Sequence, residues 1–452
     1  MKKTLFLFFI LLGIAGVSVM IYKYRHHESD AADFRDWALT PPMGWNSWDC
    51  YGPTVTEKEV MDNADYMARH LASYGWEYVV VDIRWFVEND KAGGYNQDDP
   101  VYVMDEYGRY LPAANRFPSG FKALGDYIHG LGLKFGIHIM RGIPVKAVNE
   151  DTPVLGAPGI SARMIYSPDN QCKWLRDNYS VDMSKSGAQE YYNSIIQLYA
   201  SWGVDFIKCD DLSAPIYHKE EIEALRKAID FCGRPIVLST SPGATPYDAA
   251  EHVSSHANMW RMVDDVWDHW WYIPHLIETA ENWYPWIGGG TWPDCDMIPL
   301  GRISIRGERG EDRLTRLTPD EQYTLMSLFC ILRSPLMFGG DLPSMDPFTL
   351  SLLTNREVLR MHRESSEVRQ LYRKGGVVAI TSVNSKSGDR YLAIFNLTEE
   401  DAVAEIPPRE LELSGAVKVT DLWTDRPETS QLIELKAHQS RLLMICPNTT
   451  AQ

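Results

Sequence analysis

The chain has few basic residues and lacks several common catalytic and metal-binding motifs. Its 44 Lys and Arg residues are outnumbered by 61 Asp and Glu residues, giving a formal net charge of −17. This balance, without a basic stripe, argues against nucleic acid or an anionic membrane surface as a partner. There is no C-x-x-C pair, no G-x-S-x-G nucleophile elbow and no Gly-rich loop ending in G-K-[ST]. The sequence therefore gives no indication of a zinc finger, an α/β-hydrolase or a nucleotide-binding P-loop.

Cysteine and histidine residues are too scattered to define a metal site. The seven cysteines are an odd number and widely spaced. An oxidising compartment would allow one or two disulfides, but the sequence does not give their pairing. His252 and His256 lie four residues apart beside Glu251, without the H-E-x-x-H order of zinc proteases. We therefore expect no metal or organic cofactor, and the sequence does not indicate an oligomeric state.

The N-terminal residues form a segment distinct from the rest. Lys2 and Lys3 precede an apolar run from Thr4 to Tyr22, close to the roughly 20 residues that span a bilayer. We interpret residues 1–28 as either a cleaved signal peptide or an uncleaved membrane anchor, followed by a polar tether over 29–37. The body is then expected outside the cytoplasm, periplasmic or extracellular, with membrane attachment through residues 4–22 if the leader is retained.

Between Pro42 and about Gly340, short apolar runs alternate with longer helical patterns. This alternation predicts an α/β fold, a (β/α)₈ TIM barrel over residues 38–360. The predicted strands are Met43–Trp45, Tyr78–Asp82, Lys134–His138, Phe206–Asp210, Ile236–Ser239, Met259–Met262, Trp286–Gly289 and Leu336–Gly339. The predicted helices are Glu57–Leu71, Phe121–Leu131, Ala188–Trp202, Lys219–Phe231 and Pro319–Leu332.

After about Ser365 the pattern changes to short strands separated by turn residues. This is typical of an antiparallel β-sandwich, which we place at residues 366–452. Its predicted strands are Val377–Ser382, Arg390–Asn396, Ala402–Ile406, Val417–Asp421, Leu432–Leu435 and Arg441–Ile445.

Two carboxylates stand at the ends of predicted barrel strands. Asp210 closes the strand that begins at Phe206, and Lys208 shares its face because side chains alternate along a strand. Asp265 follows the strand that ends near Arg261. Two carboxylates facing one pocket are the equipment for cutting a glycosidic bond. Taken separately, the first segment could equally be a structural ion pair, and the second is better explained as a solvated acidic loop.

Taken together, several segments resemble glycoside hydrolase family 27, the α-galactosidase family of clan D. Thr40–Trp48 is similar to the family's opening P-P-M-G-W-N-S-W, and Gly132–His138 to its third strand. Trp202–Asp210 resembles W-G-V-D-x-x-K-x-D, and the segment from Trp260 to Trp270 resembles W-R-x-x-x-D-x-x-D-x-W. The likeness extends over residues 38–445, with further matches at Trp292–Met297 and Ser334–Met337.

The resemblance implies a double-displacement mechanism and a set of sugar-binding residues. Asp210 would be the nucleophile and Asp265 the general acid/base of a retaining exo-glycosidase that removes terminal α-D-galactosyl residues from oligo- or polysaccharides. The positions that match the family's sugar pocket are Trp45, Asp82, Ile83, His138, Lys208, Ser241, Arg261 and Asp296.

Three departures from the family pattern bear on the substrate. The family usually has two adjacent aspartates after the second strand, whereas here Ile83 follows Asp82; His138 replaces a Tyr, and Ser239–Gly243 replaces a C-E-W-P-like loop. An apolar Ile83 near the sugar C6 would suit β-L-arabinopyranose, which lacks the hydroxymethyl group. The alternatives are therefore a β-L-arabinopyranosidase, a related hydrolase acting on α-glucosidic dextran ends, and a catalytically inactive carbohydrate-binding protein.

Overall fold

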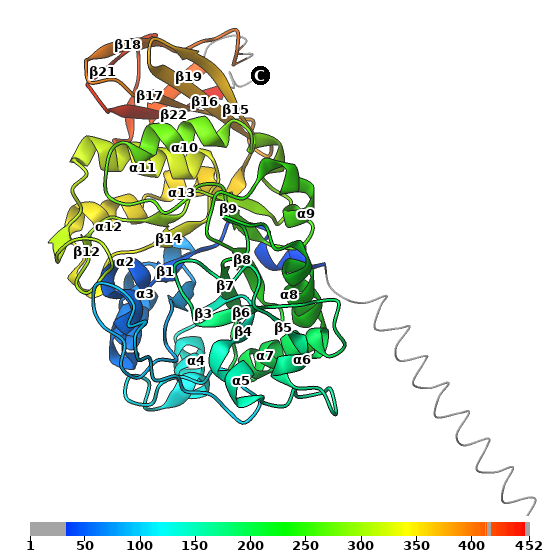
Figure 1. Cartoon of the computed structure of the whole chain (residues 1–452). Helices are drawn as coiled ribbons and strands as arrows, with labels where there is room; N and C mark the ends of the chain where they lie inside the picture. Colours follow the sequence, from blue (N-terminus) through cyan, green and yellow to red (C-terminus); the bar gives the residue numbers. More distant parts are fainter. Residues whose placement is uncertain (1–32, 412, 414–416, 448–452) are drawn as a thin grey trace, which may run out of the picture.

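The computed structural model describes residues 33–411, 413 and 417–447 as a barrel capped by a smaller β domain (Figure 1). The predicted leader over residues 1–28 lies outside the described residues. Within the described part of the chain, no helix is long and apolar enough to cross a membrane.

A parallel sheet closed into a barrel forms the centre of the larger domain. The strand order is β10-β9-β8-β7-β3-β2-β1-β14-β11. β10 and β11 are two halves of one chain segment, separated by Cys295 and Asp296, so the sheet closes through this segment as its seventh position. The strands are β1 (Met43–Asn46), β2 (Tyr78–Val81), β3 (Lys134–Met140), β7 (Phe206–Asp210), β8 (Val237–Thr240), β9 (Met259–Arg261), β10 (Trp292–Asp294), β11 (Met297–Ile298) and β14 (Leu336–Phe338).

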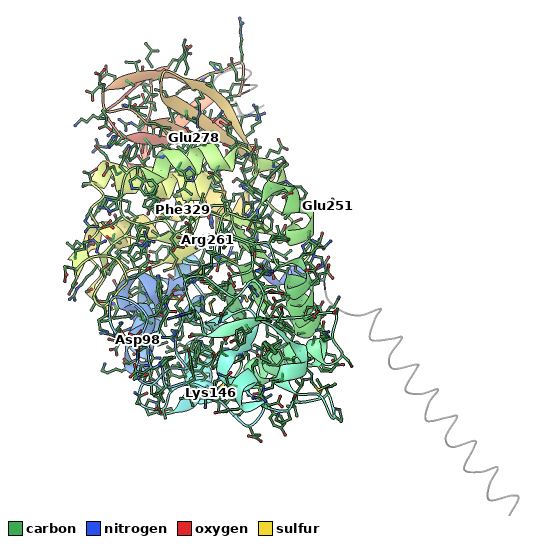
Figure 2. All side chains as sticks on the ribbon, viewed as in Figure 1. Asp98, Lys146, Glu251, Arg261, Glu278 and Phe329 are labelled. Atoms are coloured by element: carbon green, nitrogen blue, oxygen red, sulfur yellow. The ribbon has the colours of Figure 1, made fainter. Side chains whose placement is uncertain are left out.

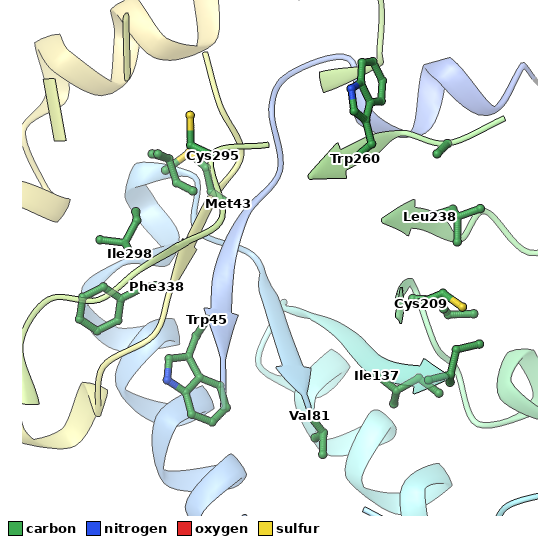
Figure 3. Close-up of a cluster of buried hydrophobic side chains, with 14 of the residues drawn as sticks. Met43, Trp45, Val81, Ile137, Cys209, Leu238, Trp260, Cys295, Ile298 and Phe338 are labelled. Carbon is green, nitrogen blue, oxygen red and sulfur yellow. The ribbon is translucent and has the colours of Figure 1, made fainter. Parts of the chain in front are cut away.

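Alternation along these strands separates two hydrophobic clusters. Tyr78, Val80 and Phe206 belong to a cluster that fills the barrel interior, as expected for a barrel whose centre is packed rather than open. The intervening residues, such as Val81 and Cys209, belong to the larger cluster between the sheet and the helices (Figure 3). The inward-facing positions of the strands are thus apolar within the barrel and polar at its mouth, where the strands end.

Helices surround the barrel, and two begin with reciprocal side-chain caps. Thr56 and Glu59 form a capping box at α3, and Thr318 and Glu321 form one at α11. The longer helices are α3 (Glu57–His70), α4 (Gly120–Gly130), α7 (Ala188–Ser201), α8 (Lys219–Cys232), α10 (Tyr272–Ala280), α11 (Pro319–Ile331) and α13 (Arg356–Glu364). The shorter elements are α2 (Trp48–Tyr51), β4 (Ile143–Pro144), α5 (Val145–Glu150), α6 (Ala162–Ile165), β5 (Tyr166–Ser167), β6 (Asn178–Val181), α9 (Ala250–Ser254), β12 (Arg302–Ile303), β13 (Arg313–Leu314) and α12 (Pro347–Leu353).

The C-terminal domain is antiparallel. A six-stranded sheet of order β15-β16-β17-β22-β19-β20 packs against the pair β18-β21. Its strands are β15 (Ser365–Lys374), β16 (Val377–Asn384), β17 (Arg390–Asn396), β18 (Ala402–Glu405), β19 (Val417–Asp421), β20 (Arg426–Pro427), β21 (Leu432–Leu435) and β22 (Ser440–Pro447). The domain rests on α10 and α11 (Figure 1), and Trp423 Nε1 donates a 2.8 Å hydrogen bond to Ser327 Oγ of α11.

The barrel followed by a β-sandwich is thus confirmed, but the predicted strand Trp286–Gly289 is wrong. Tyr284–Trp286 forms a 3₁₀ turn containing Pro285. Gly288, Gly289 and Gly290 then adopt positive φ angles, which interrupt extended structure. The seventh strand begins only after these glycines, at Trp292. β15 and α10 were not predicted.

Two further differences concern the predicted tether and the cysteines. Phe34–Ala38, largely assigned to the tether, forms a 3₁₀ helix that packs on the barrel. The Arg226 guanidinium group lies 4.7 Å from the ring centroid of Trp37, and Asn258 Nδ2 donates to the carbonyl of Phe34 at 2.9 Å. All seven cysteines are free, so the structure contains none of the disulfides considered from the sequence.

Candidate active site

A pocket of about 480 Å³ opens at the C-terminal ends of the barrel strands. Residues from most of the strand ends and following loops line it, which is where enzymes of this architecture carry their chemistry. The lining residues are Trp48, Asp49, Asp82, Ile83, Tyr95, Trp174, Lys208, Asp210, Ala214, Pro215, Pro242, Gly243, Arg261, Asp264, Asp265, Val266, Trp267, Asp296, Met297, Glu308 and Arg309.

Asp210 is held as a carboxylate at the end of β7. His138 Nε2 lies 3.1 Å from its Oδ2 atom, and the Ser241 hydroxyl donates a hydrogen bond to Oδ1. Burial alone would raise the pKa of Asp210. The charges of His138 and Lys208, together with hydrogen bonds from His138 and Ser241, outweigh burial and hold the pKa well below its usual range. Asp210 is therefore ionised at neutral pH.

Lys208 and Asp82 form a buried pair beside Asp210. Lys208 Nζ lies 3.1 Å from Asp82 Oδ2, and Asn46 Nδ2 donates to the same oxygen at 2.8 Å. Burial lowers the pKa of Lys208, but the charges of Asp82, Asp210 and Asp296 outweigh it and raise the pKa above its ordinary value. This part of the pocket therefore offers a fixed ammonium group and a fixed carboxylate to a polar ligand.

Arg261 joins two further carboxyl groups. Its Nη2 atom lies 3.1 Å from Asp265 Oδ1, and its Nη1 atom lies 2.6 Å from Asp296 Oδ1. The side chain of Asp265 is 40% exposed, whereas that of Asp296 is 8% exposed. Burial raises the pKa of Asp296 to about 7, against the lowering effect of Arg261 and with a further rise from the charge of Asp265. Both carboxyl groups line the pocket, and Asp265 is the more exposed of the two.

Asp49 is a third kind of carboxyl group in the pocket. It follows Trp48 in α2 and is only 3% exposed, and its Oδ2 atom has no hydrogen-bond partner among the described residues. Burial raises its pKa well above the usual value, and the charges of Asp296 and Asp265 add to this effect. Burial therefore favours the protonated form of Asp49 over its carboxylate form.

The structure brings seven of the ten predicted site residues to the pocket wall: Asp82, Ile83, Lys208, Asp210, Arg261, Asp265 and Asp296. His138 and Ser241 are buried beneath it and reach Asp210 instead. The prediction for Trp45 is wrong. Trp45 is fully buried on the outer face of β1, where Nε1 donates to the carbonyl of Gly340 at 2.9 Å. Strand alternation turns its neighbour Asn46 toward Asp82 instead.

Sequence reasoning missed most residues of the pocket rim. Trp48, Tyr95 and Trp174 come from three separate segments, and the rings of Trp48 and Tyr95 lie 5.7 Å apart. Trp48 is the last residue of the opening motif Thr40–Trp48, so the sequence did contain a signal that it and the adjoining Asp49 lie at the pocket. Tyr95, Trp174 and the pair Glu308–Arg309 lie in long loops without a recognisable pattern.

A separate group of side chains has the composition of a metal site. The potential ligand atoms of Glu223, His252 and His256 lie within 4.8 Å of one another. Among the described residues, this is the one group of three or more His, Cys, Asp or Glu side chains whose potential ligand atoms lie this close together. None of the three residues lines the pocket.

Two family descriptions match most of the chain. The description "Alpha galactosidase A" matches residues 40–147 and 178–364, and "Alpha galactosidase C-terminal beta sandwich domain" matches residues 375–445. α-Galactosidase A of Cellvibrio japonicus is 27% identical over 379 residues, covering 80% of this chain and 76% of that protein.

Solved structures give closer matches over nearly the whole chain. A family 27 β-L-arabinopyranosidase from Geobacillus stearothermophilus is 50% identical, with a TM-score of 0.90, covering 93% of this chain and 99% of that one. A proposed α-N-acetylgalactosaminidase of Bacillus halodurans is 49% identical, with a TM-score of 0.82, covering 91% and 98%. The resemblance found in the sequence therefore extends to the whole described fold.

Proposed function

Since the chain belongs to glycoside hydrolase family 27, we propose that within this α-galactosidase-like family it removes terminal β-L-arabinopyranosyl residues from oligo- or polysaccharides. α-D-Galactosides are its second, slower class of substrate. The two sugars share the configuration of their ring hydroxyl groups and differ at C5, where galactose carries a hydroxymethyl group. The side chain facing that substituent therefore decides between them.

Ile83 is the observation that supports this preference. Its side chain lines the pocket next to Asp82, and its backbone N–H group donates a 2.9 Å hydrogen bond to Asp82 Oδ1. A hydroxymethyl group placed against Ile83 would lose water without gaining a hydrogen bond from that side chain. An apolar wall rejects an added hydroxyl group by only about 10²-fold, so slow hydrolysis of α-galactosides is also expected. The likeness to the Geobacillus stearothermophilus β-L-arabinopyranosidase supports the same assignment.

The roles of the two carboxylates follow from their surroundings. Asp210, ionised beside Lys208 and His138, attacks the anomeric carbon while Asp265 gives its proton to the departing oxygen. The resulting glycosyl-enzyme is hydrolysed when Asp265 takes a proton from water, and Asp210 leaves as a carboxylate. The product keeps the anomeric configuration of the substrate. Asp296 shares Arg261 with Asp265, and burial raises the pKa of Asp296 to about 7.

A panel of 4-nitrophenyl glycosides tests the substrate preference. The panel comprises β-L-arabinopyranoside, α-D-galactoside, α-N-acetyl-D-galactosaminide and α-D-glucoside. We expect kcat/KM to be highest for the β-L-arabinopyranoside and roughly 10- to 100-fold lower for the α-D-galactoside. Faster hydrolysis of the α-galactoside would contradict the preference. If the protein bound these glycosides but hydrolysed none of them, the proposed mechanism would be contradicted.

Leaving-group dependence separates the two carboxylates. Asp210→Asn should abolish hydrolysis of every aryl glycoside, because no covalent intermediate forms. Asp265→Ala should retain glycosylation by 2,4-dinitrophenyl glycosides, whose leaving group needs no proton, while losing it for alkyl glycosides. Equal loss with both leaving groups in Asp265→Ala would remove Asp265 from the acid role.

Export of the enzyme is also part of the proposal. It is supported by Lys2 and Lys3 before the apolar run from Thr4 to Tyr22. Cell fractionation followed by N-terminal sequencing of the active protein tests it. Activity in the soluble cytoplasmic fraction with an intact N-terminus would contradict export.

A further inference from the structure

Glu223, His252 and His256 form a cluster on the helical layer outside the barrel. Glu223 lies in α8, His252 in α9, and His256 in the turn that follows α9. Glu251, the neighbour of His252, lies at the outer edge of the molecule in Figure 2, whereas Arg261 of the pocket lies near its centre. The cluster is therefore separate from the residues assigned to glycoside hydrolysis.

The potential ligand atoms of the three side chains lie within 4.8 Å of one another. The imidazole rings of His252 and His256 stack with centroids 4.2 Å apart and planes 24° apart. His252 Nε2 lies 3.4 Å from Glu223 Oε1, and it is buried without a hydrogen-bond partner. Lys227 Nζ lies 3.5 Å from the other oxygen of Glu223, Oε2, which leaves Oε1 facing the imidazoles.

The second nitrogen of each imidazole ring already has a partner. His256 Nδ1 lies 2.7 Å from the carbonyl oxygen of His252, an atom that can only accept, so Nδ1 carries the proton and Nε2 has a free lone pair. His252 Nδ1 lies 2.6 Å from the Tyr217 hydroxyl oxygen, which can accept a hydrogen bond from Nδ1–H in the same way. Metal-binding histidines are oriented by outer hydrogen bonds of this kind.

We propose that Glu223, His252 and His256 bind a divalent cation of the zinc class. Two neutral imidazole nitrogens and one carboxylate oxygen are a ligand set that suits Zn²⁺. All three residues are partly exposed, so water completes the coordination and the ion can enter from solvent. The ion would connect α8 to α9 on the outside of the barrel.

Tyr217 links this site to the pocket. It stands in the loop between β7 and α8, and the same loop supplies Ala214 and Pro215 to the pocket wall. A metal ion that fixes His252 also fixes its hydrogen bond to Tyr217, and so restrains this loop. The ion is therefore expected to stabilise the fold without taking part in bond cleavage.

Isothermal titration of the full chain with ZnCl₂ at pH 7.5, after dialysis against EDTA, tests the site. The protein carries His26→Gln and His27→Gln and no polyhistidine tag, because imidazoles in the leader would also bind zinc. We expect one equivalent of Zn²⁺ to bind and the melting temperature to rise with zinc concentration. His256→Gln should weaken binding more than tenfold, and Tyr217→Phe by about tenfold through loss of the outer hydrogen bond.

Two matched variants serve as controls: Glu220→Gln, an exposed residue of α8, and His275→Gln, an exposed residue of α10. Both should bind zinc as tightly as the parent chain. Zinc binding of equal strength in His256→Gln and the parent, or no binding to the parent, would overturn the proposal and leave His252 and Glu223 as a plain side-chain contact. Circular dichroism of each variant checks that a loss of zinc binding does not result from unfolding. The assay needs no substrate, so its outcome is independent of the proposed glycosidase specificity.

Discussion

The hydroxyl group of Ser241 donates a hydrogen bond to Oδ1 of Asp210, while Oδ2 of the same carboxylate lies 3.1 Å from His138 Nε2. Both oxygens are therefore held from beneath the pocket, by Ser241, which directly follows β8, and by His138 of β3. This arrangement fixes the direction of the carboxylate and favours its charged form over the protonated one.

Ser241→Ala should move the acidic limb of the pH profile to higher pH. The variant loses a hydrogen bond to the charged form of Asp210, so the depressed pKa of that carboxyl group rises toward its ordinary value. A hydrogen bond to a charged group contributes about 1.5–3 kcal/mol, which corresponds to a shift of roughly one pH unit or more. The measurement is kcat/KM for an aryl glycoside between pH 3 and pH 8.

Thr240→Val is the matched control for this prediction. Thr240 is the preceding residue of β8, is fully buried and has no hydrogen-bond partner for Oγ1 in the described chain. Its side chain faces away from the barrel interior, so the acidic limb should not move. A Ser241→Ala profile that coincides with that of the parent would show that this hydrogen bond does not control the ionisation of Asp210.

Ile83→Asp should shift the specificity from β-L-arabinopyranosides toward α-D-galactosides. A carboxylate at this position could accept a hydrogen bond from the galactose C6 hydroxyl group, which the isoleucine cannot. We expect the ratio of kcat/KM for the α-galactoside to that for the β-L-arabinopyranoside to rise by about tenfold or more. Ile83→Val keeps the apolar wall and should leave the ratio nearly unchanged. An unchanged ratio in Ile83→Asp would mean that another residue sets the preference.

Trp45 and Trp48 should give opposite phenotypes. Trp45→Phe removes the Nε1 hydrogen bond to Gly340 and leaves that carbonyl unpaired, so the variant should lose roughly 1–3 kcal/mol of stability with KM unchanged. Trp48→Ala removes a ring from the pocket wall and should raise KM with a smaller effect on stability. Thermal unfolding and steady-state kinetics on both variants check this. A raised KM in Trp45→Phe would place that residue back at the substrate.

Period-two alternation accounts for what the sequence could and could not predict. It placed Lys208 and Asp210 on one face of a strand, and both line the pocket. The same rule would have excluded Trp45 had Asn46, the polar residue of β1, been used to mark the inner face, because the adjacent Trp45 then points outward. Apolar content alone also suggested a strand at Trp286, where three glycines with positive φ prevent one.

Contacts between distant segments could not be predicted from the sequence, because they form only when those segments pack together in the fold. Asp49 is defined as a pocket residue only when α2 meets the strand ends, and Glu223 joins His252 and His256 only when α8 packs beside α9. The sequence shows the two histidines four residues apart but holds no local signal for the carboxylate. Tyr95 and Trp174 likewise reach the rim through loops whose course depends on the folded barrel.

Asp49→Asn should make the protein more stable at neutral and alkaline pH, but not at acidic pH. The pKa of Asp49 is raised in the folded state, so the native protein keeps a proton that the unfolded chain releases above about pH 4. Stability from this group is therefore complete at low pH and declines as the pH rises toward the folded-state pKa, by up to about 1.4 kcal/mol per pH unit. A neutral Asn carries no such proton, so the difference in the free energy of unfolding between variant and parent should grow between pH 5 and pH 8.

Urea unfolding of both proteins at four pH values across this range measures that difference. Asp98→Asn is the control for the loss of a carboxyl group, because Asp98 is exposed and does not line the pocket (Figure 2). A difference for Asp49→Asn that stays constant, or that shrinks as the pH rises, would mean that Asp49 is already ionised in the folded pocket. In that case the carboxyl groups at the barrel mouth would carry one more negative charge. A buried Asp49 carboxylate would then need a positively charged partner in the pocket wall.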